Sequence, residues 1–457
     1  MNVRIISITI ENIKNIEYGK IVLENPNKLF KASVLGLYGQ NGSGKTAVID
    51  VIQLLRYVLC GNSVPDFFAD YINVDAHQAA LSYEFRLQNQ NEDYNVTYSF
   101  ILDSIYDDAA HNSDASSSPK KKVIIRNEIL RCPLLSTHGT KSGILINTDS
   151  DDGFMPKTEM RFLTGEHNHI EILVAKKITA LSSRSFIFSK ELLSIIFSRE
   201  NEAASMELSF YASILQSLVQ FGNCNLFTVN TLNSGLISLH AQPLFFLQET
   251  EIKTLMLLSD DPMLIKHKDK QVAEKIINSI NIVLSKIVPG LKIGLTVLGS
   301  QAMENGEAGD IIQLMSRNNR IPLKFESEGI KKIISILHLL IAVYNQPSIT
   351  VAIDELDSGI FEYLLGEILR IISLKGKGQL VFTSHNLRPL ETLDKGFVAF
   401  TTTNPKKRYV RMKNVKQNNN LRDFYYRDIM LGEQSDELYR ETNNAEIAFA
   451  FREAGVF

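Results

Sequence analysis

Residues 39 to 46 restrict the fold of this chain most strongly, because they form a complete phosphate-binding loop. In order, they are Gly39, Gln40, Asn41, Gly42, Ser43, Gly44, Lys45 and Thr46. An apolar run at 33–38 precedes the loop and an apolar-periodic segment at 46–59 follows it, which predicts a strand, the loop and a helix. Backbone amides at such a helix N-terminus, together with the helix dipole, attract phosphate. The chain is therefore predicted to bind a nucleotide.

Each residue type in this loop has a distinct expected task. The glycines let the backbone curl tightly around a β-phosphate, because they accept conformations that a side chain would prevent. Lys45 is expected to reach the β- and γ-phosphate oxygens, and the Thr46 hydroxyl is placed for Mg²⁺. The alternative interpretation, a glycine-rich turn without a ligand, does not explain the strand before the loop and the helix after it.

Composition narrows the class of protein without choosing a chemistry. With 457 residues, the chain can hold about two to three domain-sized units. A net charge of −3 argues against a protein coated in basic surface for nucleic acid. The three cysteines are far apart and form no Cys-x-x-Cys pair, so we expect a reducing cytosol and no structural zinc. No apolar run approaches about 20 residues and no secretion signal is apparent, so we expect a cytoplasmic protein without a membrane anchor.

A second strand-like run supplies candidate groups for ATP hydrolysis. Residues 348–353 are apolar and lead into Asp354 and Glu355, here called the carboxylate pair. Asp354 is expected to hold Mg²⁺ through its water shell, and Glu355 to orient or deprotonate the attacking water. Another apolar run at 379–384 delivers His385 to the ligand-binding edge of a parallel sheet, where it can contact the γ-phosphate. The plainer alternatives are an acidic helix start and a structural histidine.

The remaining patterns predict the organisation of the chain. Alternation predicts two strands before the phosphate loop, at 3–10 and 20–23, and an antiparallel β-lobe from strands at 79–87, 94–102 and 123–130. Helical periodicity predicts a compact helical arm in the middle, followed by strands at 293–298 and 311–315. We therefore expect an α/β protein with three parts: an N-terminal lobe at 1–183, a helical arm at 184–292 and a C-terminal lobe at 293–457.

One further segment gives the chain its resemblance to a known family. Residues 325–331, Phe-Glu-Ser-Glu-Gly-Ile-Lys, head a predicted helix that runs to Val343, and this signature segment places Ser327 and Gly329 at the helix N-terminus. With it, the chain resembles the ABC-type ATPases, in the SMC and RecF-like branch that includes AAA-family ATPases of prokaryotic anti-phage defence. The family order of phosphate loop, signature, Asp-Glu strand, aspartate turn and strand-end histidine is matched by residues 39–46, Ser327 and Gly329, the carboxylate pair, Asp357 and His385.

The resemblance implies an ABC-type core with a mixed or parallel sheet, an antiparallel β-lobe and the inserted helical arm. It implies ATP and Mg²⁺ as ligands and a head-to-tail homodimer, or a higher oligomer built from such dimers. Ser327 of each copy would reach the γ-phosphate held by the other copy's Lys45, with Gly329 and Asp357 beside the nucleotide. The implied catalytic groups are Glu355, His385 and Ser327. Glu326, Glu328 and Ile330 depart from the usual signature, which is compatible with slow hydrolysis.

Two main functions follow from this resemblance, and a third, weaker possibility is an ATP-gated assembly protein with neither role. The first is an ATP-dependent sensor and scaffold of a defence system, similar to the ATPases of the two-gene PARIS and Septu systems, which holds or releases a separate toxic nuclease. The stretch after His385 is too short for the nuclease domain that related defence ATPases carry, so we expect this chain not to be a nuclease itself. The alternative is a RecF-like DNA clamp, for which the basic run at 406–416 could follow a nucleic-acid backbone. The plainer interpretation of that run is the solvated last strand of the sheet.

Overall fold

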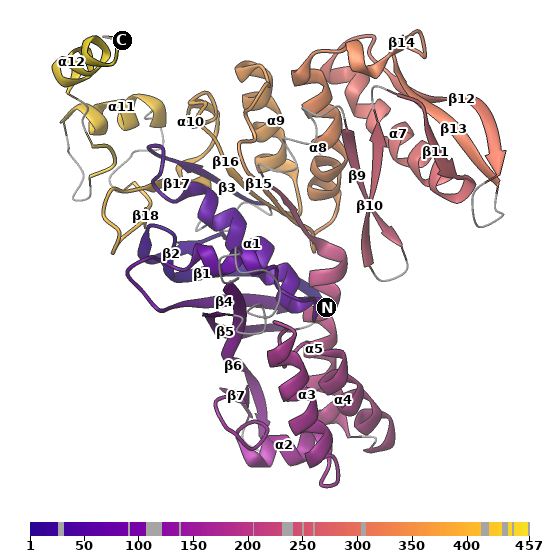
Figure 1. Cartoon of the computed structure of the whole chain (residues 1–457), viewed down its shortest axis with the longest axis vertical. Helices are drawn as coiled ribbons and strands as arrows, with labels where there is room; N and C mark the ends of the chain where they lie inside the picture. Colours follow the sequence, from indigo (N-terminus) through magenta and orange to yellow (C-terminus); the bar gives the residue numbers. More distant parts are fainter. Residues whose placement is uncertain are drawn as a thin grey trace, which may run out of the picture.

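The computed structural model describes most of the chain. The described residues are 1–25, 32–89, 92–106, 121–136, 139–203, 205–230, 241–248, 251–258, 261–302, 308–412, 420–431, 437–440 and 443–455. Four sheets and the helices around them account for these residues, and Figure 1 shows their arrangement. The α/β class expected from the sequence is confirmed.

The central sheet is built from short strands that come from distant parts of the chain. Its order is β18-β17-β3-β16-β15-β8, in which all neighbours are parallel except β17 and β18. The strands are β3 (Ser33–Tyr38), β8 (Leu226–Val229), β15 (Thr350–Ile353), β16 (Gln379–Thr383), β17 (Val398–Thr401) and β18 (Tyr409–Val410). Because helices or another sheet cover both faces, β3, β15 and β16 are buried along their whole length. The apolar runs at 33–38, 348–353 and 379–384 are thus confirmed as core strands.

The predicted antiparallel β-lobe is also present. Its strand order is β2-β1-β4-β5-β6-β7. The strands are β1 (Asn2–Ile13), β2 (Ile16–Val22), β4 (Gln78–Gln88), β5 (Asp93–Tyr106), β6 (Lys121–Ser136) and β7 (Gly139–Asn147). Along β4, buried and half-buried residues alternate, as expected for a sheet that places one face against a core.

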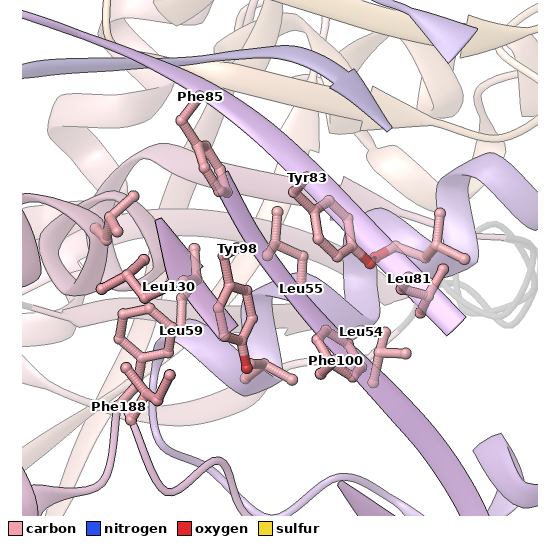
Figure 2. Close-up of a cluster of buried hydrophobic side chains, with 14 of the residues drawn as sticks. Leu54, Leu55, Leu59, Leu81, Tyr83, Phe85, Tyr98, Phe100, Leu130 and Phe188 are labelled. Carbon is pink, nitrogen blue, oxygen red and sulfur yellow. Dashed lines mark hydrogen bonds between the residues drawn. The ribbon is translucent and has the colours of Figure 1, made fainter. Parts of the chain in front are cut away.

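Helix α1 (Lys45–Leu59) fills the space between the two sheets. Its apolar face packs against aromatic side chains of β4 and β5, and Figure 2 shows Leu55 and Leu59 beside Tyr83, Tyr98 and Phe100. The Tyr83 hydroxyl donates a hydrogen bond of 2.8 Å to the carbonyl of Val51 on α1. Helix α1 is packed against a sheet on each side. The phosphate loop is therefore attached to a rigid helix.

The other face of the central sheet carries a second core. Alternate residues such as Leu35 and Val34 belong to the two different cores, as the pleat of the strand requires. The second core is covered by α7 (His267–Ile287), α8 (Glu328–Asn345) and α9 (Glu362–Lys375), followed by the short α10 (Pro389–Thr392). Figure 1 shows α8 and α9 on the side of the sheet opposite α1.

A buried glutamine joins the two sheets. Gln379 on β16 is fully buried, and its side-chain amide exchanges two hydrogen bonds of 2.8 Å with the backbone N–H and C=O of Ile5 on β1. The Thr350 hydroxyl on β15 donates to the same amide oxygen at 2.9 Å. All polar atoms of this contact between sheets are therefore satisfied inside the core.

The middle of the chain, where a compact helical arm was expected at 184–292, contains both helices and strands. Helices α2 (Lys157–Thr164) and α3 (His169–Leu181) start before that range, and α4 (Lys190–Ala203) and α5 (Met206–Gln220) lie within it. Strand β8, also within it, belongs to the central sheet. The four-residue run of β8 is too short for its period to distinguish a strand from a helix. The domain limits themselves remain a prediction.

Smaller elements complete the fold. A hairpin pairs β9 (Ala241–Gln248) with β10 (Glu251–Leu258), and a separate sheet holds β11 (Met263–Lys266), β12 (Ile293–Ala302), β13 (Ala308–Ser316) and β14 (Ile321–Pro322). The 3₁₀ turns are η1 (Asp66–Tyr71), η4 (Leu323–Phe325) and η5 (Lys395–Phe397), and η3 (Phe221–Asn225) is a π-helical turn. Near the C-terminus lie α11 (Leu421–Leu431) and α12 (Asn444–Ala454), the latter without a buried residue. Among the helices of the described residues, none has both the length and the apolar character needed to cross a bilayer.

Candidate functional site

The phosphate loop, residues 39–46, leaves the end of β3 and enters α1, as the sequence predicts. The Lys45 ammonium lies inside the loop, where Nζ donates hydrogen bonds to the carbonyls of Gly39 at 2.8 Å and Gln40 at 3.0 Å. Burial lowers the pKa of Lys45, and the nearby carboxylates of Asp354, Glu355 and Asp357 oppose that shift. A cation thus sits in the loop, facing carboxylates from the second half of the chain.

Residues from both ends of the chain hold the loop in shape. Asn15 donates a side-chain hydrogen bond to the carbonyl of Gly42, and the Tyr409 hydroxyl on β18 donates to the carbonyl of Gly44 at 2.8 Å. Gly39 has φ +151°, and a Cβ at this position would lie 1.8 Å from the Thr401 hydroxyl oxygen. Only glycine avoids this clash, so the first glycine of the loop is required by its neighbour on β17.

Asp354 follows directly after β15 and points towards the loop. The Thr46 hydroxyl donates to Asp354 Oδ1 at 3.2 Å, which joins residues far apart in sequence. The Thr383 hydroxyl at the end of β16 donates to the same oxygen at 2.6 Å. The Asp354 side chain is therefore held between two hydroxyl groups, and the residue is only 1 % exposed.

The second member of the carboxylate pair is held in an unusual backbone conformation. Glu355 has φ +47°, in the left-handed region that non-glycine residues adopt only when their surroundings require it. Its backbone N–H donates to the Thr383 hydroxyl at 2.7 Å, and the N–H of Leu356 donates to the Thr383 carbonyl at 3.0 Å. Whereas Asp354 is buried, Glu355 is exposed at this edge of the sheet. A single threonine thus fixes both acidic residues.

His385 lies at the end of β16, on the same edge. Its backbone N–H and that of Asn386 donate to Asp357 Oδ2 at 3.1 and 2.9 Å. The other carboxylate oxygen of Asp357 is buried without a hydrogen-bond partner among the described residues. Asp357 therefore sets the path of the histidine loop, residues 384–386, within its own chain.

Lys332 on α8 adds a second cation near the carboxylates. Lys332 is 5 % exposed, and burial lowers the pKa of its ammonium while Glu355, Asp354 and Asp357 act in the opposite direction. The arrangement compensates part of the negative charge that the acidic residues concentrate at this edge.

The signature segment is placed differently from the other predicted site residues. Ser327 is the exposed N-cap of α8, where its side chain accepts a hydrogen bond from the N–H of Ile330 at 3.4 Å. No hydrogen bond links Ser327 to the phosphate loop among the residues that the structure describes. Gly329 approaches the turn after the carboxylate pair so closely that a Cβ would lie 2.1 Å from the carbonyl oxygen of Gly359. One chain therefore assembles the phosphate loop, carboxylate pair and histidine loop, but leaves Ser327 at its surface.

The donor set suits Mg²⁺ in the presence of phosphate. The Thr46 hydroxyl and the Asp354 carboxylate lie side by side, and both are hard oxygen ligands. Among the described residues, no group of three or more His, Cys, Asp or Glu side chains could hold a metal by itself. A site with few protein oxygens matches Mg²⁺, which keeps water and phosphate oxygens in its coordination shell.

Sequence reasoning missed the residues that position these groups. These positioning residues belong to no motif, because their partners lie on other elements. They are Thr383, Lys332, Asn15, Thr401 and Tyr409. Their roles depend on the order of strands in the central sheet. Of these residues, only Thr383 carried a sequence signal: it is a hydroxyl residue in an otherwise apolar strand, just before His385.

Comparisons with known proteins agree with a nucleotide-binding core. Residues 34–128 match a family model described as "AAA domain, putative AbiEii toxin, Type IV TA system". This match includes the phosphate loop and part of the β-lobe. No curated protein sequence gives a significant match.

Several solved structures are similar to this chain at low identity. An Smc head domain with an extended coiled coil, bound to the C-terminal domain of ScpA derived from Pyrococcus furiosus, is 13 % identical, with 90 % of this chain and 96 % of that chain covered and a TM-score of 0.41. The SMC head domain from Thermotoga maritima is 13 % identical over 90 % of this chain and 99 % of its own, with a TM-score of 0.36. The recombination mediator RecF with ATP is 10 % identical over 84 % and 93 %, with a TM-score of 0.33. These similarities are distant in both sequence and structure.

Proposed function

We propose that this chain is an ABC-type ATPase that binds ATP with Mg²⁺ and hydrolyses it to ADP and phosphate. The observation that carries this proposal is the meeting of Lys45, Thr46, Asp354 and Glu355 at one edge of the central sheet, although they come from the two halves of the chain. An acidic pair beside a phosphate loop supplies both a place for the metal and a group that can act on water.

In this proposal, each group has a separate step. Lys45 and the backbone amides of the loop bind the phosphates and stabilise the charge that develops on them. Mg²⁺, held by the Thr46 hydroxyl and by Asp354, would neutralise charge on the β- and γ-phosphates. Glu355, exposed at the sheet edge, orients the attacking water and accepts its proton. His385, held by Asp357, contacts the γ-phosphate.

Removal of the Thr383 hydroxyl tests this arrangement. We expect Thr383→Val to lower kcat for ATP hydrolysis by about 10-fold or more with little change in KM, because a lost buried hydrogen bond costs about 1–3 kcal/mol and here frees both acidic residues. Thr350→Val is the matched control, since it removes a buried hydroxyl whose partner is Gln379. Steady-state kinetics and thermal melts of both variants decide the question. If Thr383→Val and Thr350→Val have equal kcat values and equal melting temperatures, Thr383 does not position the carboxylate pair.

The active form is proposed to be a dimer with shared sites. Ser327 and the N-terminus of α8 are exposed and make no hydrogen bond to the phosphate loop within the described chain. A helix N-terminus with an exposed hydroxyl is suited to bind an anion. In a head-to-tail pair, Ser327 of one copy would contact the γ-phosphate bound by the other copy's Lys45. ATP would then hold the pair together, and hydrolysis would release it.

The biological role that we propose is that of a sensor and scaffold in anti-phage defence, which holds or releases a separate toxic effector and is not itself a nuclease. The match of residues 34–128 to a family described by a toxin and a toxin–antitoxin system supports this role. We place the protein in the cytoplasm. A RecF-like DNA clamp remains the alternative function.

Two arginines of the basic run at 406–416 give the DNA alternative little support, whereas Lys406 and Lys407 are exposed. Arg408 donates to the carbonyls of Thr402 at 2.7 Å and Asn15, and it is only 5 % exposed. Arg411 donates to the carbonyls of Val22 at 2.8 Å and Gly396. These two guanidinium groups are engaged by backbone carbonyls of this chain. Lys413 and Lys416 lie outside the described residues.

Affinity purification from the native host separates the two roles. We expect the amount of a nuclease or toxin-like protein that is retained to differ clearly between tagged Glu355→Gln and tagged Lys45→Ala. The reason is that only Glu355→Gln keeps bound ATP. Mass spectrometry and nucleic-acid sequencing identify what is bound. Duplex DNA retained only by Glu355→Gln, without such a protein, would replace the defence role with the clamp.

A further inference from the structure

A cavity lies at the far end of α1, away from the phosphate loop. Its volume is about 290 Å³, and its walls come from the end of α1, the start of α4, the end of α5 and the π-helical turn η3. This volume is at the lower limit of small-molecule pockets, which occupy roughly 300–1,000 Å³. π-Helical turns occur frequently at functional sites. We call this cavity the α1–α4 pocket.

The charge on the wall of the α1–α4 pocket has one sign. Arg56 on α1 and Lys190 at the start of α4 both line it, and no carboxylate does. Neither cation makes a hydrogen bond or ion pair with another described residue. Two cations that line one pocket without a carboxylate make it favourable for an anion.

The remaining wall offers hydrogen bonds and an aromatic surface. The side-chain amides of Asn62 and Asn223 line the pocket, and neither hydrogen-bonds to another residue of the described chain. Half-buried Tyr57 supplies an aromatic face. A few polar groups beside apolar side chains are typical of a site for an organic ligand.

The pocket is connected to the nucleotide site through rigid elements. Helix α1 has 15 residues and separates its two ends by about 22 Å. Gln53, which also lines the pocket, accepts a hydrogen bond of 3.2 Å from Asn230, the residue after β8. The carbonyl of Val229 at the end of β8 accepts a hydrogen bond of 2.8 Å from the backbone N–H of Asp354. A ligand in the pocket would thus contact the helix that starts at Lys45 and lie close to the strand beside Asp354.

We propose that the α1–α4 pocket binds a small organic phosphate, with the phosphate at Arg56 and Lys190 and the organic part against Tyr57. A phosphate monoester carries about −1.5 to −2 charges at pH 7, which matches two cations better than a single carboxylate does. Arginine provides a planar fork for phosphate oxygens, and lysine provides a point charge. This site is separate from the phosphate loop, and its existence does not depend on ATP hydrolysis.

The test uses the full chain with Lys45→Ala, so that the phosphate loop does not compete for the probe. The probes are adenosine 5′-monophosphate and ribose 5-phosphate, with adenosine as the uncharged comparison. Cys60 lines the pocket, whereas Cys132 and Cys224 are buried, so alkylation of Cys60 by iodoacetamide reports occupancy by mass spectrometry. We expect at least one of the two phosphates to slow alkylation of Cys60 about 10-fold at saturation, and adenosine to have no such effect.

Substitution of the cations distinguishes this site from general anion binding. In the same background, Arg56→Gln with Lys190→Gln is expected to raise the Kd of the protective phosphate, measured by calorimetry, by about 10-fold or more. Lys177→Gln, at an exposed lysine of α3, is the control for a lost surface charge. Both cations are at least partly exposed, so melting temperatures should stay close to that of the parent protein. Failure of both phosphates to protect Cys60, or equal Kd values in the double variant and the control, would overturn the proposal.

Discussion

Glu355→Gln protein should bind ATP, hydrolyse it about 10²-fold or more slowly than the parent, and accumulate as a dimer. The carboxylate accepts the proton of the attacking water in our account, and loss of a general base typically costs about 10²–10⁴ in rate. Glutamine keeps the size and the hydrogen-bonding reach of the side chain but cannot take up the proton. Because in our proposal hydrolysis separates the two copies, the variant should remain a closed dimer.

The measurement is light scattering of the purified variant with and without ATP and Mg²⁺, where the monomer has a mass of 51.4 kDa. Lys45→Ala is the matched control, since it removes the cation that reaches the phosphates. Loss of two charge-assisted hydrogen bonds should weaken ATP binding by about 3 kcal/mol or more, roughly 100-fold, and leave this protein monomeric. An equal amount of dimer in Glu355→Gln with and without ATP would count against an ATP-dependent interface.

The elements that the sequence predicted well are those whose chemistry is local. The phosphate loop, its strand and its helix form one continuous segment, and so do the apolar strand and the two acids at Asp354 and Glu355. Period-two alternation over eight or more residues was enough to identify β4 and β5. In such segments, the nearest neighbours in sequence supply most of the physical constraint.

What could not be predicted depends on contacts between distant segments. Strand β8 has only four residues, so its place in the central sheet follows from its neighbour β15 and not from its own pattern. Thr383 fixes both acids only because β16 lies beside β15. The basic run at 406–416 has the composition of a nucleic-acid site, yet Arg408 and Arg411 satisfy carbonyls of this chain. Charge in a sequence does not tell whether its partner is internal.

The position of the signature segment could be predicted from the sequence, but its proposed contact lies in another copy of the chain. Ser327 was predicted at a helix N-terminus, and it lies there. Its proposed partner belongs to another copy, so a single chain cannot place its hydroxyl in the site. Gly329 lies very close to Gly359, so a shift of α8 would also move the turn after the carboxylate pair. We therefore expect the arrival of a second copy to affect the carboxylates through this contact.

A mixture of two inactive variants tests the shared site most directly. Ser327→Arg places a bulky cation where the hydroxyl should meet the γ-phosphate, and Lys45→Ala removes the lysine of the phosphate loop, so each protein alone should show little or no ATP hydrolysis. In a mixed dimer, one site combines an intact phosphate loop from the first variant with an intact signature segment from the second. We predict that mixing restores hydrolysis at about one working site per mixed dimer, with a dependence on the ratio of the two proteins that peaks near equal amounts. A mixture that stays as inactive as its components, while both variants remain folded, would contradict a site shared between two copies.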